Sequence, residues 1–330
     1  MLNWAIHGTG FISHAMITAI AASNGSRVHT IIGRNPETLA EFQTQYAIPN
    51  TATDAAQPLA DPEIDAIYIA LPNHLHHTAT IAASNAGKAV LCEKSLTTTM
   101  EQADALATTI RTNNTFFAEG LMYLAHPLYA RLTELLLDGR LGKLRAIHGH
   151  YAADIHGVTN PLGRGTLFNL GCYPVSLMHL VIQTMCGPDA FANRTLLATG
   201  NTEPDHGTVV DAAMTCKFAN GVLATLQSTD TYGMSHGFTI SGENGTLELI
   251  TNPWLPVAGD NHIQWRPYTG TPEDIIVNTG HDAFYHQVKM IETALKDGKT
   301  QATRPSPTLS DSLDIMGLLT EWDTAILGEK

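Results

Sequence analysis

A glycine-rich turn near the start of the chain has the residue types and spacing to bind the phosphates of a dinucleotide. Glycines there permit a tight turn and let the backbone approach a pyrophosphate at a helix N-terminus. The turn lies between an apolar strand-like run, residues 2–7, and a run with helical spacing, and Ser13 stands where the fingerprint has its third glycine. The alternative is a doubly wound α/β domain that has the same turn but binds no nucleotide. The expected cofactor contacts are Gly8, Thr9, Gly10, Phe11 and Ile12.

The end of the second expected strand indicates which dinucleotide is bound. NAD enzymes usually place a carboxylate there for the ribose 2′-hydroxyl, whereas this chain has Gly33, Arg34 and Asn35 after the apolar run 28–32. An arginine at this point can pair with the 2′-phosphate of NADP. The sequence therefore predicts NADP(H) as cofactor; the alternative role of Arg34 is a solvated turn residue.

Alternating strand-like and helical segments position these residues. Apolar runs at 2–7, 28–32, 66–71 and 89–92 are separated by segments of helical spacing, and Asn35 with Pro36 has the pattern of a helix start. This rhythm is typical of a parallel sheet covered on both faces. We therefore predict an α/β protein whose residues 1–122 form a Rossmann domain for NADP.

The pattern changes from residue 123 onward. After one helix, longer strand-like runs dominate, and Asn220-Gly221 and Asn244-Gly245 favour tight antiparallel hairpins between them. We predict that residues 123–330 form an α+β substrate and dimerisation domain with a mostly antiparallel open sheet and a C-terminal helix at about 309–327. Because an apolar sheet face must be buried somewhere, we expect a homodimer through that face.

Composition argues against several classes of protein. The chain has 31 acidic against 18 basic residues and a net charge of -13, so we expect neither nucleic acid nor a membrane as partner. The four cysteines have no paired spacing and suggest reduced thiols in the cytoplasm. We expect no export signal or membrane span, and because the 16 histidines are scattered we expect no metal.

Four motifs occur in a fixed order along the chain: GTGFISH at 8–14, ALPNHLHH at 70–77, CEKSL at 92–96 and LFNLGCYP at 167–174. In this combination the chain resembles the Gfo/Idh/MocA oxidoreductase family. Residues 33–34 (GR) and 119–127 (EGLMYLAHP) look most like its dihydrodiol dehydrogenase and NADP-dependent D-xylose dehydrogenase branch.

The resemblance implies an enzyme that moves a hydride to or from a hydroxyl or carbonyl carbon of a sugar, polyol or related diol. It implies that Lys94 reaches the reacting oxygen, that Tyr173 is the second catalytic group, and that the second sheet forms a homodimer. Besides Lys94, further cofactor contacts would come from Glu93, Ala70, Leu71, Pro72, Asn73 and His74.

Some positions depart from the family pattern. Ser95 replaces the proline of the EKP motif, Asn169 replaces the acid four residues before the tyrosine, and Leu124 stands where this branch often has an arginine. Asn169 cannot carry charge or take a proton, so we expect it to bind substrate and to orient Lys94 and Tyr173.

Three other residues have open alternatives. Tyr123, His126 and Arg164 are expected to bind substrate together with Asn169 and Tyr173, but His126 could instead cap a helix and Arg164 could pair with acids. The function also has alternatives: a tightly held cofactor that supports sugar chemistry without net redox change, or an NADP-binding sensor that catalyses nothing.

Overall fold

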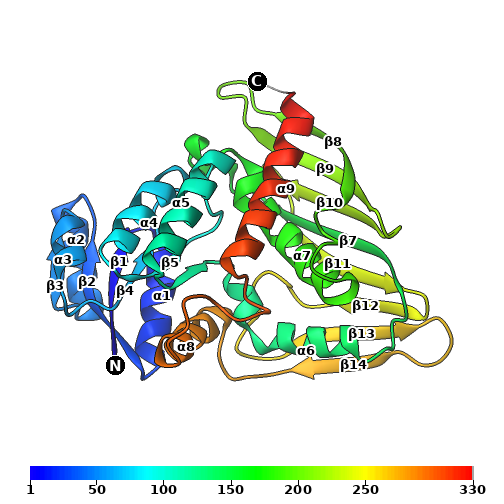
Figure 1. Ribbon diagram of the computed structural model, residues 1–330, viewed down its shortest axis with the longest axis horizontal. Coiled ribbons are helices and arrows are strands. Elements are labelled where there is room, and N and C mark those ends of the chain that lie inside the picture. Colours follow the sequence, from blue (N-terminus) through cyan, green and yellow to red (C-terminus); the bar gives the residue numbers. More distant parts are fainter. Residues whose placement is uncertain (329–330) are drawn as a thin grey trace. The chain divides into compact units, whose positions relative to one another are not determined.

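The computed structural model describes residues 1–328, which form two compact units (Figure 1). The first unit consists of Met1–Met122 and Phe284–Ser312, and the second of Tyr123–Ala283 and the chain from Leu313 onward. The expectation that all of 123–330 belongs to the second domain is corrected, because Phe284–Ser312 returns to the first unit.

The first unit contains a six-stranded parallel sheet in the order β3-β2-β1-β4-β5-β6. This is the predicted Rossmann arrangement. The order reverses between β1 and β4, and in such sheets ligands bind beyond the carboxyl ends of the strands at that point. The strands are β1 (Leu2–His7), β2 (Ser26–Ile32), β3 (Asn50–Ala52), β4 (Ala66–Ile69), β5 (Ala89–Cys92) and β6 (Phe117–Glu119).

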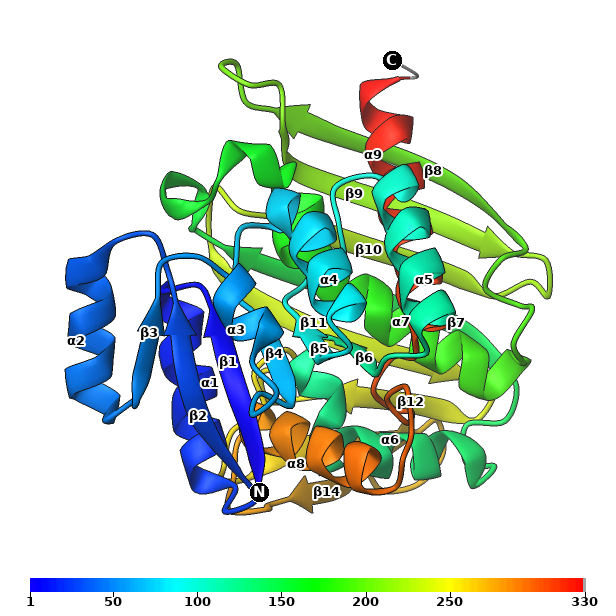
Figure 2. The ribbon, with the colours of Figure 1, turned by 60° about the vertical axis from the view of Figure 1, so that its left-hand side comes forward.

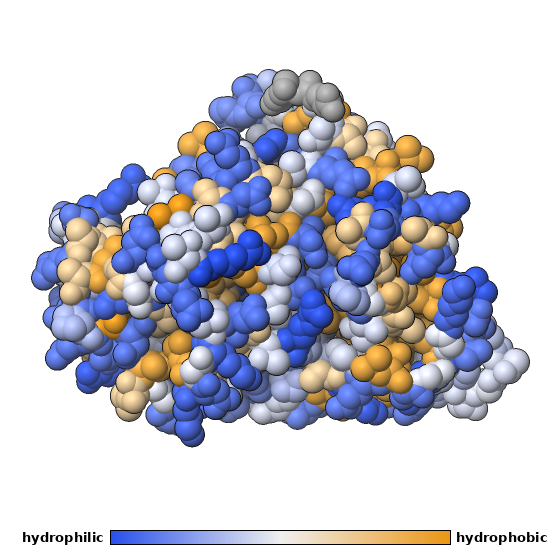
Figure 3. Space-filling view, viewed as in Figure 1, coloured by the Kyte–Doolittle hydropathy of each residue, from blue (hydrophilic) through white to orange (hydrophobic). Residues whose placement is uncertain are grey.

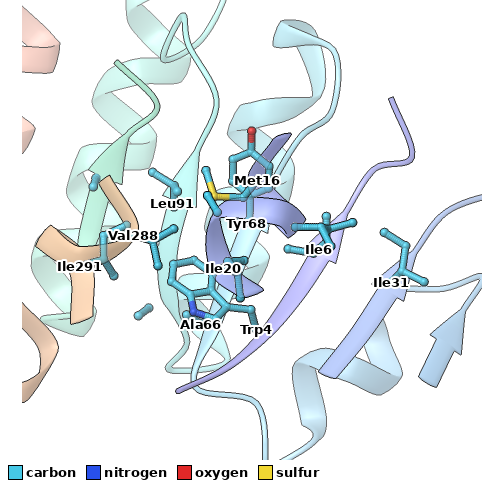
Figure 4. Close-up of a cluster of buried hydrophobic side chains, with 14 of the residues drawn as sticks. Trp4, Ile6, Met16, Ile20, Ile31, Ala66, Tyr68, Leu91, Val288 and Ile291 are labelled. Carbon is cyan, nitrogen blue, oxygen red and sulfur yellow. The ribbon is translucent and has the colours of Figure 1, made fainter. Parts of the chain in front are cut away.

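Helices cover both faces of this sheet. In one core, Trp4 and Tyr68 of the sheet pack with Met16 of α1 and with Val288 and Ile291 of α8 (Figure 4). Burial of this apolar stripe explains why α8 returns to the first unit. On the other face α4 and α5 lie side by side (Figure 2). The helices are α1 (Phe11–Ala22), α2 (Pro36–Tyr46), α3 (Ala56–Ala60), α4 (His76–Asn85), α5 (Met100–Asn113) and α8 (Ala283–Lys296).

Local signals set the ends of several helices, as the sequence predicts. The side chain of Asn35 accepts hydrogen bonds from the backbone N–H groups of Glu37 and Thr38 at the start of α2. Thr99 accepts one from Gln102 at the start of α5. These caps satisfy N–H groups that have no partner within the helix.

The second unit is built on an eight-stranded sheet in the order β14-β13-β12-β11-β7-β10-β9-β8. Only the β7–β10 pair is parallel, so the mostly antiparallel sheet is confirmed, as are the hairpins β9–β10 and β11–β12. The strands are β7 (Leu144–Ala153), β8 (Arg194–Thr202), β9 (Val209–Phe218), β10 (Leu223–Thr229), β11 (Met234–Gly242), β12 (Gly245–Leu249), β13 (Asn261–Pro267) and β14 (Glu273–Val277).

Helices α6 (Pro127–Leu137), α7 (Cys172–Cys186) and α9 (Leu309–Leu327) pack on one face of this sheet. The opposite face is exposed, and it is more polar than the sequence argument assumed. Its exposed apolar residues include Leu197, Leu223 and Ile276. Exposed polar residues on the same face are Thr195, Thr199, Thr215, Lys217, Thr225 and Gln227.

None of the helices within residues 1–328 has the length and apolar character needed to cross a bilayer. On the face shown in Figure 3, apolar residues lie in small groups among polar ones.

Candidate active site

The glycine-rich turn is shaped by one close backbone approach. Gly8 has φ +128°, and a Cβ there would lie 2.4 Å from the carbonyl oxygen of Ala70, so only glycine fits. The buried hydroxyl of Ser13, which replaces the third glycine, donates to the carbonyl of Gly8 at 2.8 Å. Gly10 precedes α1, where no side chain caps the helix, and a Cβ on it would meet nothing within 4 Å. The space beside Gly10 at the start of α1 is therefore open, and a helix N-terminus of this kind can bind a phosphate.

The other members of this turn lie around the same helix start. Phe11 is 86% exposed and Ile12 is half-buried. Thr9 approaches the end of β2, because a Cβ on Gly33 would come within 2.8 Å of its methyl group. The turn after β1 and the turn after β2 are thus in contact.

Arg34 extends from the turn after β2. Its side chain is exposed, and within residues 1–328 it makes no hydrogen bond or ion pair. Asn35 beside it is committed to capping α2. The guanidinium is therefore available to an added phosphate, and no carboxylate occupies residues 33–35 to favour a ribose hydroxyl instead.

The turn after β4, residues 70–74, contains buried polar atoms that lack partners. Within the described residues, Nδ2 of Asn73 and Nδ1 of His74 are buried without a hydrogen bond. Buried polar atoms are nearly always satisfied in folded proteins. Together with the cradle at Gly8, these atoms fit a nicotinamide dinucleotide bound along the carboxyl ends of β1 and β4.

His76 links this turn to the turn after β5, a role that the sequence did not reveal. Its Nε2 lies 2.8 Å from the carbonyl oxygen of Leu71, and its Nδ1 lies 2.9 Å from that of Ser95. Burial lowers the pKa of His76 to about 4, against the opposing effect of both carbonyls. The neutral imidazole therefore lies between the two turns that carry the expected cofactor and catalytic residues, and its one N–H donates to one of their two carbonyls.

Glu93 and Lys94 follow β5 at the carboxyl edge of the sheet. The hydroxyl of Tyr68, on β4, donates to Oε1 of Glu93 at 2.5 Å, and burial raises the pKa of this carboxyl. Lys94 is half-buried, and the Lys94–Ser95 peptide is cis where the family has a proline. Lys94 therefore lies just beyond the carboxyl end of β5, on the side of the sheet where ligands bind in this type of fold.

Glu119, at the end of β6, is a site residue that the sequence analysis missed. It is 2% exposed, and burial raises its pKa to about 7, a rise opposed by the Ser312 hydroxyl and the backbone of Leu96. Lys94 also lowers its pKa, whereas Glu93 raises it. The sequence analysis included it in the EGLMYLAHP motif at 119–127 but gave it no role. Two buried carboxyls, those of Glu93 and Glu119, therefore interact with Lys94.

Within the second unit, a separate cluster of expected site residues lies around the start of α7. Asn169 lies in a π-helical turn, Leu167–Gly171, and Tyr173 follows in the first turn of α7 with 7% of its surface exposed. Tyr123 is fully buried, and its hydroxyl lies 3.0 Å from the carbonyl of Tyr173 and 2.6 Å from the hydroxyl of Ser176. Tyr123 therefore fixes the backbone that carries Tyr173, and its expected contact with substrate stays a prediction.

His126 and Arg164 are engaged in structural contacts. His126 caps α6 by accepting from the N–H of Leu128 at 3.1 Å, the role that the sequence left open. Arg164 pairs with the buried carboxylate of Asp323 on α9. The structure thus favours the capping and pairing alternatives for these two residues.

Asp230, directly after β10, is a second residue that the sequence analysis missed. Its side chain is fully buried, and its Oδ1 lies 3.6 Å from Nδ1 of His156. Asn169 also interacts with this carboxyl. No motif of the sequence pointed to it, since it lies 61 residues from Asn169.

Two family models match the chain. That of the oxidoreductase family with an NAD-binding Rossmann fold, Gfo/Idh/MocA, matches residues 2–121, and that of the Gfo/Idh/MocA C-terminal domain matches residues 129–248.

Similar proteins include two curated dehydrogenases. Trans-1,2-dihydrobenzene-1,2-diol dehydrogenase of Xenopus tropicalis is 24% identical, with 97% of this chain and 96% of that protein covered. D-xylose 1-dehydrogenase (NADP(+)) of Hypocrea jecorina is 25% identical, with 92% of this chain and 82% of that protein covered.

Solved structures of the same fold contain different cofactors. A 3-ketoreductase from Actinomadura kijaniata, in complex with NADP and TDP-benzene, has a TM-score of 0.85 at 22% identity and covers 98% of both chains. A levoglucosan dehydrogenase, in complex with NADH and levoglucosan, has a TM-score of 0.82 at 19% identity and covers 98% of this chain and 96% of the other.

Proposed function

Because the chain belongs to the Gfo/Idh/MocA oxidoreductase family, we propose that it transfers a hydride between NADP(H) and a hydroxyl or carbonyl carbon of a sugar, polyol or related diol. The observation that carries this proposal is the position of Lys94. It follows β5 at the carboxyl edge of the Rossmann sheet, next to the turns that offer a dinucleotide site. The names of the two curated relatives, a diol and a sugar dehydrogenase, support the substrate class.

The cofactor supplies or accepts the hydride, and the protein manages charge and protons around the reacting oxygen. As a carbonyl is reduced, negative charge grows on its oxygen, so an ammonium group nearby stabilises that charge and can deliver a proton. Lys94 has this role in our proposal, and Tyr173 assists it. Tyr123 and His76 hold the backbone on which these groups stand.

The preference for NADP over NAD belongs to this proposal. The fold itself accommodates both, as the two solved structures bind NADP and NADH. What supports NADP in this chain is the exposed Arg34 beside the turn after β2. A free guanidinium at this position suits a 2′-phosphate.

The proposed function is tested by following the absorbance of reduced nicotinamide while the purified protein is offered aldoses, inositols and diols with NADP or NAD. We expect NADPH to accumulate with at least one of them. Binding of NADPH without turnover of any aldose, inositol or diol would support the alternative of an NADP-binding sensor that catalyses nothing. Sugar conversion without free NADPH would support chemistry with no net redox change.

Tyr173→Phe is expected to lower kcat by about fivefold, less than the loss expected for Lys94→Ala. The change removes one hydrogen-bonding group worth about 1 kcal/mol and leaves the aromatic packing against Tyr151 and Trp254. Steady-state kinetics at saturating NADPH measure it, with the melting temperature as control. A loss as large as that of Lys94→Ala would make Tyr173 the main proton donor.

A homodimer through the exposed face of the second sheet remains our proposal for the assembly, on the ground that an eight-stranded sheet has helices on one face only. Light scattering is expected to give twice the mass of the 330-residue chain at micromolar concentration. A monomeric mass would contradict it, and the polar character of the face would then be the reason.

Free thiols at all four cysteines support the proposed cytoplasmic location.

A further inference from the structure

Asp230 is held in the second unit by backbone hydrogen bonds on both sides. Its N–H donates to the carbonyl of Val210, and its own carbonyl accepts from the N–H groups of Ile155 and His156 at 2.9 and 2.8 Å. The segment that carries His156 is thereby fixed to the end of β10. The position of the Asp230 carboxyl is therefore set by the fold.

This carboxyl is buried, and His156 and the side chain of Asn169 are the nearby groups outside Asp230 that favour its charged form. Within residues 1–328, neither oxygen makes a hydrogen bond of ordinary distance and angle, and Nδ1 of His156 is 3.6 Å away. The nearby hydroxyls of Thr229 and Thr231 donate to Asp211 instead. An unsatisfied buried carboxylate destabilises a fold, so packing does not account for this residue.

The groups that face Asp230 connect it to the proposed site. They are the imidazole of His156, the carboxylate of Asp211 on β9, and the side-chain amide of Asn169. Asn169 belongs to the π-helical turn that runs directly into Tyr173. A contact that fixes the Asn169 amide therefore acts about one helical turn from Tyr173, the proposed second catalytic group.

We propose that Asp230 is a positioning residue that fixes the orientation of the Asn169 side chain for the reaction. An ionised carboxylate only accepts hydrogen bonds, so it draws the amide nitrogen of Asn169 toward itself. The amide oxygen then faces away from Asp230 and can accept a hydrogen bond from a ligand. A protonated carboxyl can donate to that oxygen instead, which turns the amide around.

This inference rests on the proposed function, and it implies a dependence on pH. Burial raises the pKa of Asp230 to about 6, an effect that Asp211 reinforces and that His156 and Asn169 oppose. The acceptor orientation of Asn169 therefore predominates above about pH 6. We expect kcat/KM to rise with pH through this range.

The test compares three variants with the wild type. Asp230→Asn is expected to lower kcat/KM by about tenfold or more, to remove the rise near pH 6, and to keep NADPH affinity. The exchange variant Asp230→Asn/Asn169→Asp restores one carboxyl and one amide and is expected to recover most of the activity. Asp154→Asn, which removes an exposed acid two residues from His156, is the control and should match the wild type.

Thermal unfolding provides a readout that does not depend on activity. A carboxyl whose pKa is raised in the folded state destabilises that state when it ionises. The free energy of unfolding therefore falls as pH rises from about 4 to about 6, and it stays at the lower value above about pH 6. Asp230→Asn is therefore expected to melt close to the wild type at pH 4 and higher than it at pH 7.5. A lower melting temperature than that of the wild type at pH 7.5 would show that Asp230 stabilises the folded state, and it would overturn the inference.

The possible failures are distinguishable. A wild type that converts no substrate refutes the proposed function, and this inference with it. An active wild type whose Asp230→Asn variant keeps both its activity and the rise near pH 6 refutes this inference alone. An exchange variant that folds but remains as impaired as Asp230→Asn also refutes it.

Discussion

Lys94→Ala is expected to lower kcat by at least about a hundredfold while NADPH affinity is largely kept. General acid–base catalysis contributes about 10²- to 10⁴-fold, and a positive charge next to the developing oxyanion adds to that. In our proposal Lys94 acts on the reacting oxygen, so its removal is expected to lower the rate of the chemical step more than it weakens binding. Single-turnover rates and NADPH fluorescence titrations measure the two quantities separately.

The matched control for this change is Lys296→Ala, which removes an exposed lysine from the end of α8 in the same unit. It should leave kcat unchanged. Full activity of Lys94→Ala would mean either that Tyr173 alone transfers the proton or that the site lies elsewhere. In both cases the catalytic role that the family resemblance implies for Lys94 would be wrong.

Arg34→Ala is expected to weaken NADPH binding by about ten- to a hundredfold and to leave NADH binding nearly unchanged. A charge-assisted hydrogen bond is worth about 1.5 to 3 kcal/mol, and about 1.4 kcal/mol corresponds to a factor of ten. NADH lacks the 2′-phosphate, so it has little to lose. Parallel titrations with both cofactors test the difference.

Arg111→Ala controls for the loss of an exposed positive charge, since Arg111 lies in the last turn of α5 in the same unit. It should bind both cofactors as the wild type does. Equal losses for NADPH and NADH in Arg34→Ala would show that Arg34 contributes to the fold or to the common part of the dinucleotide. The preference for NADP would then need another origin.

The sequence alone determined the features that depend on neighbouring residues. The turn at Gly8, the cap at Asn35 and the hairpin at Asn220-Gly221 each follow from the conformations that a few adjacent residues can adopt. The alternation of strands and helices likewise follows from local periodicity, which is why the Rossmann sheet and the mostly antiparallel second sheet were predicted.

The tertiary structure decided which distant groups meet and which are buried. It returned α8 to the first unit and gave Arg164 a partner in Asp323, 159 residues away. It also buried Glu119 and Asp230, whose perturbed pKa values arise from desolvation. Desolvation depends on everything that surrounds a side chain, and contacts across 60 or more residues leave no periodic signal in a single sequence, so only the folded chain shows them.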